Sequence, residues 1–312
     1  MFSLNNQYII VNYHYVEDPA ADRSGIHPCS LGEFERQIKF LSGNFKIVSI
    51  PELFASAASK LAGKLCALTF DDGLRGHYDN VLPILKKYGV IGTFFPITST
   101  FEGGVPATHK MHTILSAASP QEVVVLFGSF MERFYPDLKS LYPIPDDHRL
   151  YDRRWHEDVL TANFKETMII LSEDIKGRFL RYCFKKFGLN EQSIGGKIFM
   201  TKNQVKNLHT QNMVIGSHSH RHYSMGVVEA EFMRRDIKLS KDILFGITGK
   251  DVNIFSYSHG HSTGQGVKVL KALGFNHAVT IERRNVSDQD SPFLLPRYDA
   301  NDVRDFLNSI AQ

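Results

Sequence analysis

The sequence has few cysteines, no long apolar run and almost no net charge, and each absence excludes a class of protein. Its three cysteines, Cys29, Cys66 and Cys183, are widely separated and form no CxxC pair, so neither a disulfide framework nor a structural zinc site is expected. No segment of the 312 residues is apolar for the length that a bilayer requires. The formal net charge of +3 calls for no nucleic-acid partner.

The beginning of the chain predicts a location as well. Residues 1–16 do not combine a basic segment with the long apolar core of a secretory signal. Together with the unpaired cysteines, this predicts a cytoplasmic protein that is not an integral membrane protein. A chain of 312 residues exceeds the usual domain size, but barrels of this length occur as single domains. We therefore expect one domain over residues 1–312.

The most informative stretch is an apolar run, residues 65–70, that ends in Asp71, Asp72 and Gly73. Strands buried on both faces are typical of parallel sheets and barrels, whose C-terminal strand ends carry the reacting groups. The glycine lets the backbone turn sharply, so both carboxylates can face one pocket. Two like charges so close together repel unless a cation or a shared proton lies between them. A bound metal ion is therefore the first hypothesis for this stretch.

Strand and helix patterns alternate on both sides of these residues, which is the pattern of a (β/α) barrel. The expected strands include residues 8–15, 46–50 and 91–97, and the expected helices include residues 31–41, a helix opened by Pro51, and residues 81–89. The alternation breaks between residues 103 and 197, where helical patterns cover residues 121–130 and 164–187. An unstructured loop of that length is implausible. The prediction is an α/β fold, a distorted (β/α) barrel of about seven parallel strands with a mainly helical insertion over residues 104–196.

A cluster of histidines follows the insertion. Residues 214–222 read as a strand that ends in His218, His220 and His222, at every second position. Uncharged imidazoles are costly to pack together without partners, and neutral imidazole is a common ligand of transition metals. Two histidines and one carboxylate leave coordination positions open for water and substrate. This pattern favours metal binding over a structural role.

Together the two stretches resemble a known family. Thr69–Gly73 matches the T-F-D-D-G motif, and residues 215–222 match the I-G-x-H-[ST]-x-x-H motif, of the polysaccharide deacetylases of carbohydrate esterase family four, the NodB-homology domain. The resemblance covers residues 8–100 and 197–300. It implies that Asp71 is the general base and that Asp72, His218 and His222 hold one divalent metal ion. Zinc is the first expectation, and cobalt, nickel, manganese and iron are alternatives. His220 occupies a variable position of the motif.

The later motifs of the family match less well. Residues 255–260 keep the aromatics and the glycine of the third motif but lack its arginine and proline, and the late motifs that supply the acid histidine are absent. A lone histidine such as His14 reads first as a packed side chain. In members that resemble the bacterial exopolysaccharide deacetylases, however, the acid histidine lies on an N-terminal Y-H strand, which Tyr13 and His14 match. The resemblance therefore makes His14 the candidate acid and Arg297 the candidate to orient Asp71.

These residues predict a hydrolase that removes an acetyl group from an N-acetylated sugar. A backbone N–H in the turn formed by Tyr257, Ser258, His259 and Gly260 is expected to stabilise the oxyanion. The expected partner is an N-acetylated carbohydrate within a polysaccharide, a lipid-linked glycan or a glycan precursor, as in surface-polysaccharide or O-antigen biosynthesis, with transient membrane-surface contact. An O-acetyl esterase or a non-sugar amidase on the same scaffold is one alternative. A catalytically silent carbohydrate-binding module is the other, because function belongs to the site and not to the fold.

Overall fold

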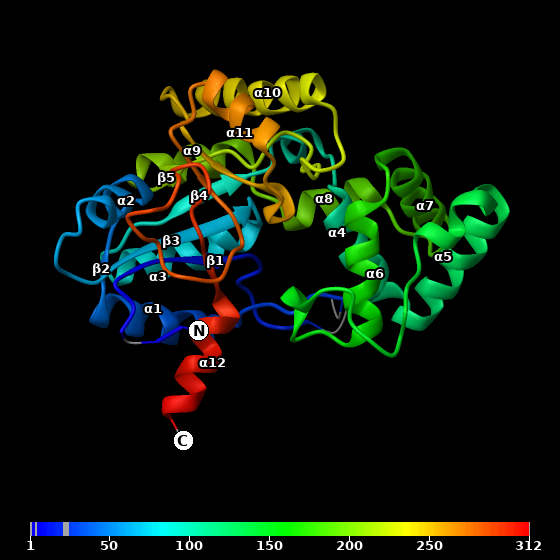
Figure 1. Cartoon of the computed structure of the whole chain (residues 1–312), viewed down its shortest axis with the longest axis horizontal. Coiled ribbons are helices and arrows are strands. Elements are labelled where there is room, and N and C mark those ends of the chain that lie inside the picture. Colours follow the sequence, from blue (N-terminus) through cyan, green and yellow to red (C-terminus); the bar gives the residue numbers. More distant parts are fainter. Residues whose placement is uncertain (1, 4, 21–24, 312) are drawn as a thin grey trace. The chain divides into compact units, whose positions relative to one another are not determined.

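The computed structural model describes residues 2–3, 5–20 and 25–311 (Figure 1). The chain folds into two compact units. Unit 1 comprises Met1–Asp18, Pro28–Gly104 and Gly195–Gln312, and unit 2 comprises Pro19–His27 and Val105–Ile194. The predicted insertion therefore falls almost entirely within unit 2, which also takes in a short segment from near the N-terminus.

Unit 1 contains all of the described strands, and every ladder between them is parallel. The strands are β1 (Tyr8–Tyr13), β2 (Lys46–Ile47), β3 (Leu65–Asp72), β4 (Thr93–Pro96), β5 (Val214–Ile215), β6 (Ile254–Ser256), β7 (His277–Val279) and β8 (Tyr298–Asp299). One sheet has the order β5-β4-β3-β1-β8, with β2 also paired to β3, and β6 pairs with β7. Figure 1 shows β1, β3, β4 and β5 side by side.

The predicted α/β fold with parallel strands is confirmed, with eight strands rather than about seven among the described residues. Single parallel bridges, Ser217 to Phe255 and Val279 to Leu295, connect the two sheets. Among the described residues the strands therefore do not form one continuous, regularly hydrogen-bonded ring.

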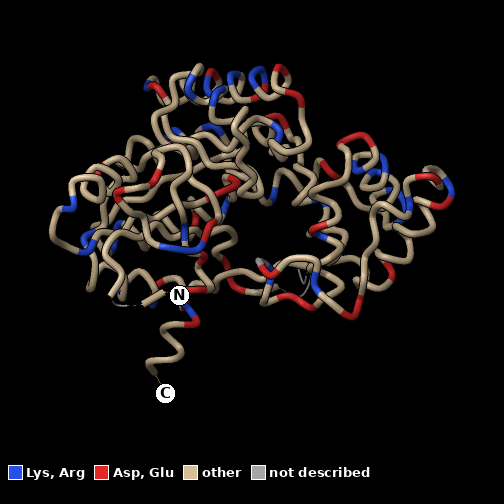
Figure 2. The backbone as a smooth tube through the Cα atoms, viewed as in Figure 1, with Lys and Arg blue, Asp and Glu red and all other residues tan. Residues whose placement is uncertain are grey.

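Most helices of unit 1 begin at a residue whose side chain caps the helix. The helices are α1 (Leu31–Asn44), α2 (Ile50–Ala58), α3 (Leu82–Lys87), α9 (Lys202–Thr210), α10 (Ala230–Thr248), α11 (Gly264–Ala272) and α12 (Ala300–Ile310). All of those described but α3 and α10 have such a capping side chain. The Ser30 and Ser49 hydroxyls accept hydrogen bonds from the third residues of α1 and α2, which satisfies N–H groups that a helix leaves unpaired. Figure 2 shows acidic and basic residues alternating along α10, where exposed ion pairs such as Lys238 with Asp242 stabilise the helix only slightly.

Successive side chains of β3 point to opposite faces of the sheet, so one face of the strand is aromatic and the other carries polar residues near its C-terminal end. Phe70 stacks between Tyr13 and Phe94, with ring centroids 5.4 and 4.7 Å away. Thr69 and Asp71 lie on the opposite face of the strand, because successive side chains point to opposite sides. The aromatic cluster thus anchors β3, while its other face carries polar side chains.

Three expected elements differ from the structure. The strand expected over residues 214–222 ends at Ile215. The N–H groups of Gly216 and Ser217 still bond to the carbonyls of Phe94 and Ile254, whereas those of His220 and Arg221 bond to a side chain of α10. The strand expected over residues 46–50 is only two residues long, since Ser49 already caps α2. The helix expected over residues 164–187 is two helices, because Leu171 and Ser172 have extended backbone dihedral angles.

Unit 2 has its own core, in which Phe127, Phe164 and Phe179 are almost fully buried. Its helices include α4 (Ala107–Ala117), α5 (Pro120–Phe134), α6 (Val159–Ile170) and α7 (Glu173–Lys186), and α8 (Glu191–Ile198) follows at its C-terminal boundary. Helix α7 has the predicted amphipathic pattern, with Phe179 buried and Arg178 exposed. Among the described residues no single helix has the length and apolar composition needed to span a membrane, and α4 and α5 meet that test only together, across a bend of 119°.

Candidate active site and metal centre

The turn at the end of β3 brings both aspartates close to His218. Asp72 has φ 76° and Gly73 has φ 71°, so the chain leaves the strand conformation at Asp72 itself. A side chain at position 73 would lie 2.7 Å from Pro96 Cβ, which explains why the sequence has glycine there. Left-handed backbone is costly for a residue other than glycine and is common at functional sites. The predicted sharp turn is confirmed.

Asp72, His218 and His222 converge on a single point, as predicted from the two motifs. The Nε2 atoms of His218 and His222 are 3.1 Å apart, and they lie 3.4 and 3.6 Å from Asp72 Oδ1. All three side chains are buried. They form a group of potential metal-ligating residues among the described part of the chain.

The protonation of His218 shows that this donor set fits a metal ion. Its Nδ1 lies 2.8 Å from the carbonyl oxygen of Ser256, and a carbonyl only accepts, so Nδ1 carries the proton. In the neutral imidazole, which is the form that binds a metal, the lone pair is then on Nε2, which faces a carboxylate oxygen and a second imidazole nitrogen. A divalent cation stabilises such a convergence of lone pairs, and two imidazoles with one carboxylate suit several transition metals.

The two histidines lie on a loop whose shape depends on side chains outside the motif. Ser219 and His222 have φ values of 64° and 60°, and the Ser219 hydroxyl accepts a hydrogen bond of 2.9 Å from the N–H of His222. The buried Asp236 of α10 accepts hydrogen bonds from the N–H groups of His220 and Arg221, at 2.9 and 3.3 Å. Helix α10 thereby holds the loop in a conformation that its own residues do not favour.

His220 lies behind the loop. Its ring is buried, and its Nδ1 is 2.9 Å from the hydroxyl of Thr98, the residue that begins the 3-10 helix after β4. This contact joins the histidine loop to the segment that follows β4.

Asp71 lies beside the metal-ligating group and is held by Arg297, which is 1% exposed. The guanidinium donates to both carboxylate oxygens of Asp71, at 3.0 and 2.8 Å. The Ser256 hydroxyl donates to the same carboxylate at 3.1 Å. Burial alone would raise the pKa of Asp71, but the charge and hydrogen bonds of Arg297 outweigh it and lower the pKa to about 2. Asp71 is therefore ionised at neutral pH.

Arg297 also contacts the floor of the site. Its Nε donates to the carbonyl oxygen of Thr280 at 2.7 Å, and one terminal nitrogen reaches Asn12 Oδ1 at 2.9 Å and Thr69 Oγ1 at 3.2 Å. These contacts fix the guanidinium plane, so the carboxylate of Asp71 is fixed with it.

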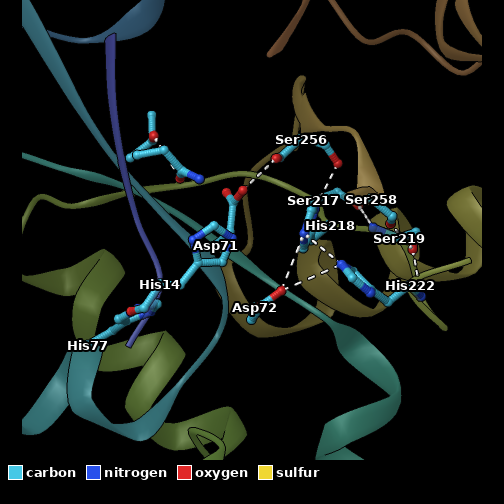
Figure 3. A network of polar contacts seen from close by, with 12 residues as sticks. His14, Asp71, Asp72, His77, Ser217, His218, Ser219, His222, Ser256 and Ser258 are labelled. Carbon is cyan, nitrogen blue, oxygen red and sulfur yellow. Dashed lines mark hydrogen bonds and ion pairs between the residues drawn. The ribbon is translucent and has the colours of Figure 1, made fainter. Parts of the chain in front are cut away.

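His14 follows β1 directly and its side chain is exposed. Figure 3 shows its ring turned toward the Asp71 carboxylate. The buried His77 lies behind it, with Nε2 2.7 Å from the carbonyl oxygen of His14. The structure thus brings the predicted acid and the predicted base together.

The turn over residues 257–260 lies beside the metal-ligating group. His259 has φ 57°, and its ring centroid is 4.5 Å from that of His222. Tyr257 is 1% exposed and packs on Phe255, so its ring belongs to the core. The N–H groups of Tyr257 and Gly260 donate to the carbonyls of Val279 and Tyr257. The predicted oxyanion donor is therefore confined to the middle of the turn.

Asp236, Ser256 and His77 were not predicted from the sequence. Ser256 ends β6, so its position at a C-terminal strand end was an available signal. Asp236 and His77 lie within helical patterns, and only their tertiary contacts distinguish them from other polar residues.

Comparison with known proteins places these features in a family. A family model described as polysaccharide deacetylase matches residues 58–122 and 185–278, which include both motifs and are half of the chain. The chain belongs to the polysaccharide deacetylase family. The unmatched residues 123–184 lie within unit 2.

A polysaccharide deacetylase by name, YxkH of Bacillus subtilis (strain 168), is 35% identical over 144 residues, which is 42% of this chain. The match spans about half, 48%, of that relative. Among solved structures, the Streptococcus pyogenes deacetylase PplD in complex with acetate has a TM-score of 0.62 at 15% identity, covering 98% of both chains. IcaB from Ammonifex degensii has a TM-score of 0.60 at 16% identity, covering 99% of this chain and 98% of its own. These likenesses show that this family fold extends over almost the whole chain.

Proposed function

We propose that this protein is a metal-dependent hydrolase that removes the acetyl group from an N-acetylated sugar of a polysaccharide, a lipid-linked glycan or a glycan precursor. The observation that carries the proposal is the buried group of Asp72, His218 and His222 beside the ionised Asp71. A structural metal site usually has all of its coordination positions filled by protein ligands, whereas a site with three protein ligands leaves a position for water or substrate. The name of YxkH supports a polysaccharide substrate, and that of PplD, a deacetylase in complex with acetate, supports the release of acetate.

Asp72 Oδ1 and the Nε2 atoms of His218 and His222 would hold the ion. When bound, such an ion lowers the pKa of water and polarises a carbonyl oxygen. Zinc remains the first expectation, with cobalt, nickel, manganese and iron as alternatives that the same ligands suit.

Asp71 is the proposed general base. Arg297 and Ser256 hold its carboxylate in one orientation. Oδ2 accepts from both of them, whereas Oδ1 accepts only from Arg297 and keeps a lone pair for a proton. Because the group is ionised at neutral pH, it can take a proton from a water molecule without first losing one. Arg297 is the proposed positioning residue, since it contacts the base and is itself buried.

His14 is the proposed general acid. An amide nitrogen leaves poorly until it is protonated, so hydrolysis of an N-acetyl group requires an acid on the leaving-group side. His14 faces Asp71 and is exposed, so its imidazole can recover a proton from solvent. The turn over Ser258 and His259 is the proposed donor to the oxyanion. The products would be acetate and an amino sugar.

Acetate release from paired N-acetylated and O-acetylated sugars tests the proposal. The reconstituted protein is expected to release acetate from the N-acetyl substrate, and Asp71→Asn and His14→Ala are each expected to abolish or strongly reduce that release. Release from the O-acetyl sugar alone would instead establish an esterase. The cytoplasmic location and the membrane-surface contact stay predictions.

A further inference from the structure

A π-helix follows the turn that carries the two aspartates, and it lies against the segment that carries His14. This π-helix, η2 (His77–Val81), begins four residues after Gly73. π-Helical segments are rare and occur frequently at functional sites. We propose that η2 positions the general acid: His77 and Asn80 hold the backbone on either side of Tyr15 and so fix the His14 imidazole relative to Asp71. The inference rests on the proposed role of His14.

His77 makes the first of the two contacts. Its Nε2 lies 2.7 Å from the carbonyl oxygen of His14, and the side chain is completely buried. The ring packs edge-to-face against both Phe70 and Phe94, with centroid distances of 5.6 and 6.0 Å. The aromatic cluster that anchors β3 therefore also fixes this imidazole.

The chemistry of the contact sets the tautomer of His77. A carbonyl oxygen only accepts, so Nε2 must carry the proton. Burial lowers the pKa of His77 to about 4, which keeps the ring neutral and leaves Nδ1 without a proton. Nδ1 has no hydrogen-bond partner among the described residues. Such a nitrogen is costly to bury, and an apolar side chain would avoid the cost, so the imidazole is explained by its bond to His14.

Asn80 makes the second contact. Its Nδ2 donates to the carbonyl oxygen of Val16 at 2.9 Å. A side chain at Gly76 would lie 2.7 Å from the same oxygen, so glycine is what allows η2 to approach this closely. On the other side, the Cys29 N–H donates to the Tyr15 carbonyl at 2.9 Å. Consecutive carbonyls from His14 to Val16 are thus all hydrogen-bonded.

The arrangement connects the acid to the base through one continuous segment. Residues 65–81 carry Asp71 on β3 and His77 on η2. The His14 side chain is exposed and follows the last residue of β1, so the packing of its own side chain does not hold it. The hydrogen bonds of His77 and Asn80 to the backbone, which we call the clamp, supply that restraint. An acid that is not held in position would protonate the leaving group less often.

The test compares substrates that do and do not need the acid. An N-acetyl sugar needs leaving-group protonation, whereas 4-nitrophenyl acetate has a leaving group that departs unprotonated. His77→Leu is expected to lower kcat for the N-acetyl sugar by at least 10-fold, part of the roughly 10²–10⁴-fold that an acid or base contributes. Turnover of the aryl ester should change by less than about twofold, since the acid contributes little to it. His14→Ala should show the same selectivity.

Two further variants separate positioning from packing. His77→Gln can place an amide N–H near the position of Nε2, so it should recover most of the N-acetyl activity that His77→Leu loses. The double variant with His14→Ala should be no slower than His14→Ala alone, because a positioning residue has nothing left to position. His277→Leu is the matched control, since His277 stacks on Phe54 and is not part of the clamp, and it should leave both activities unchanged. Equal losses on both substrates, or additive losses in the double variant, would overturn the inference.

A measurement without catalysis keeps the inference separate from the proposed function. If the protein releases no acetate from N-acetyl sugars, uniformly ¹⁵N-labelled protein can be studied by ¹H–¹⁵N NMR. The clamp predicts an Nε2–H tautomer for His77 with a slowly exchanging proton, and lower backbone order parameters at residues 14–16 in His77→Leu. An Nδ1–H tautomer, or unchanged order parameters, would show that His77 does not hold this segment.

Discussion

Replacing Arg297 by methionine should destabilise unit 1 by removing the only guanidinium that contacts Asp71 among the described residues. Arg297 donates six hydrogen bonds, to Thr280, Asn12, Thr69, Ser256 and both oxygens of Asp71. Both partners of the ion pair are at most 3% exposed. Removing one partner of a buried pair typically costs about 3–5 kcal/mol, because the other charge stays buried and uncompensated. We expect a loss of this size in the free energy of unfolding at pH 7.

Neutralising the remaining partner should recover part of this loss. In Asp71→Asn/Arg297→Met neither member of the pair is charged, so the double variant should be more stable than Arg297→Met, by about 2 kcal/mol or more. The pH dependence follows from the pKa of Asp71, which is about 2 in the folded protein, against an ordinary value of 3.8. A depressed carboxyl pKa contributes stability above the unfolded value, here about 2 kcal/mol, and this is lost as the pH falls from about 4 to 2. The difference in the free energy of unfolding between Arg297→Met and the unsubstituted protein should therefore become smaller over that pH interval.

Urea unfolding of metal-free protein, followed by far-UV circular dichroism, measures these differences. The single tryptophan, Trp155, lies in unit 2, so its fluorescence follows that unit and provides an internal control that should not change. A loss below about 1 kcal/mol for Arg297→Met would refute the reasoning. So would a double variant that is no more stable than Arg297→Met.

Three further results are expected. Asp236→Leu should weaken metal binding by about 10–100-fold in a calorimetric titration, because residues that support metal ligands affect the metal affinity to this degree. Asp236→Asn keeps an acceptor oxygen and should lose less metal affinity. Zinc at a free concentration 100 times its Kd should stabilise unit 1 by about 2.7 kcal/mol in thermal unfolding, and Asp72→Ala should remove this effect if Asp72 is a ligand. The pKa of His77 falls from 6.5 to about 4 on folding, so the unfolded chain binds more protons than the folded protein between those pH values. The free energy of unfolding should therefore drop by about 3 kcal/mol as the pH falls from 6.5 to 4. His77→Leu should lack this part of the drop, and an unchanged pH dependence in that variant would contradict a neutral buried imidazole.

The sequence predicted the parts of the site that local patterns encode. The apolar run that ends in Asp71, Asp72 and Gly73 has the structure that its composition indicates, because strand burial and a glycine turn are properties of neighbouring residues. The resemblance to the family directed attention to Arg297, and the structure places it against Asp71. The spacing of His218 and His222 identified residues that do converge.

The conformation of the histidine loop could not be predicted in this way. Alternation suggested a strand, but Ser219 and His222 adopt left-handed backbone angles that only glycine favours intrinsically. The two residues between them, His220 and Arg221, are held by Asp236 of α10. The same limit applies to His77, whose contact with His14 joins segments 63 residues apart. Such contacts depend on the tertiary structure, and no periodicity of the sequence records them.

The most direct test of the central claim is the titration of metal-stripped protein with zinc, with acetate release from an N-acetylated oligosaccharide as the readout. The account predicts that activity rises in proportion to added zinc and saturates at about one ion per chain. Asp72→Ala should bind no ion tightly and release no acetate, whereas Asp71→Asn should bind the ion and still release none. Full activity of the metal-free protein, or of Asp72→Ala, would contradict the account.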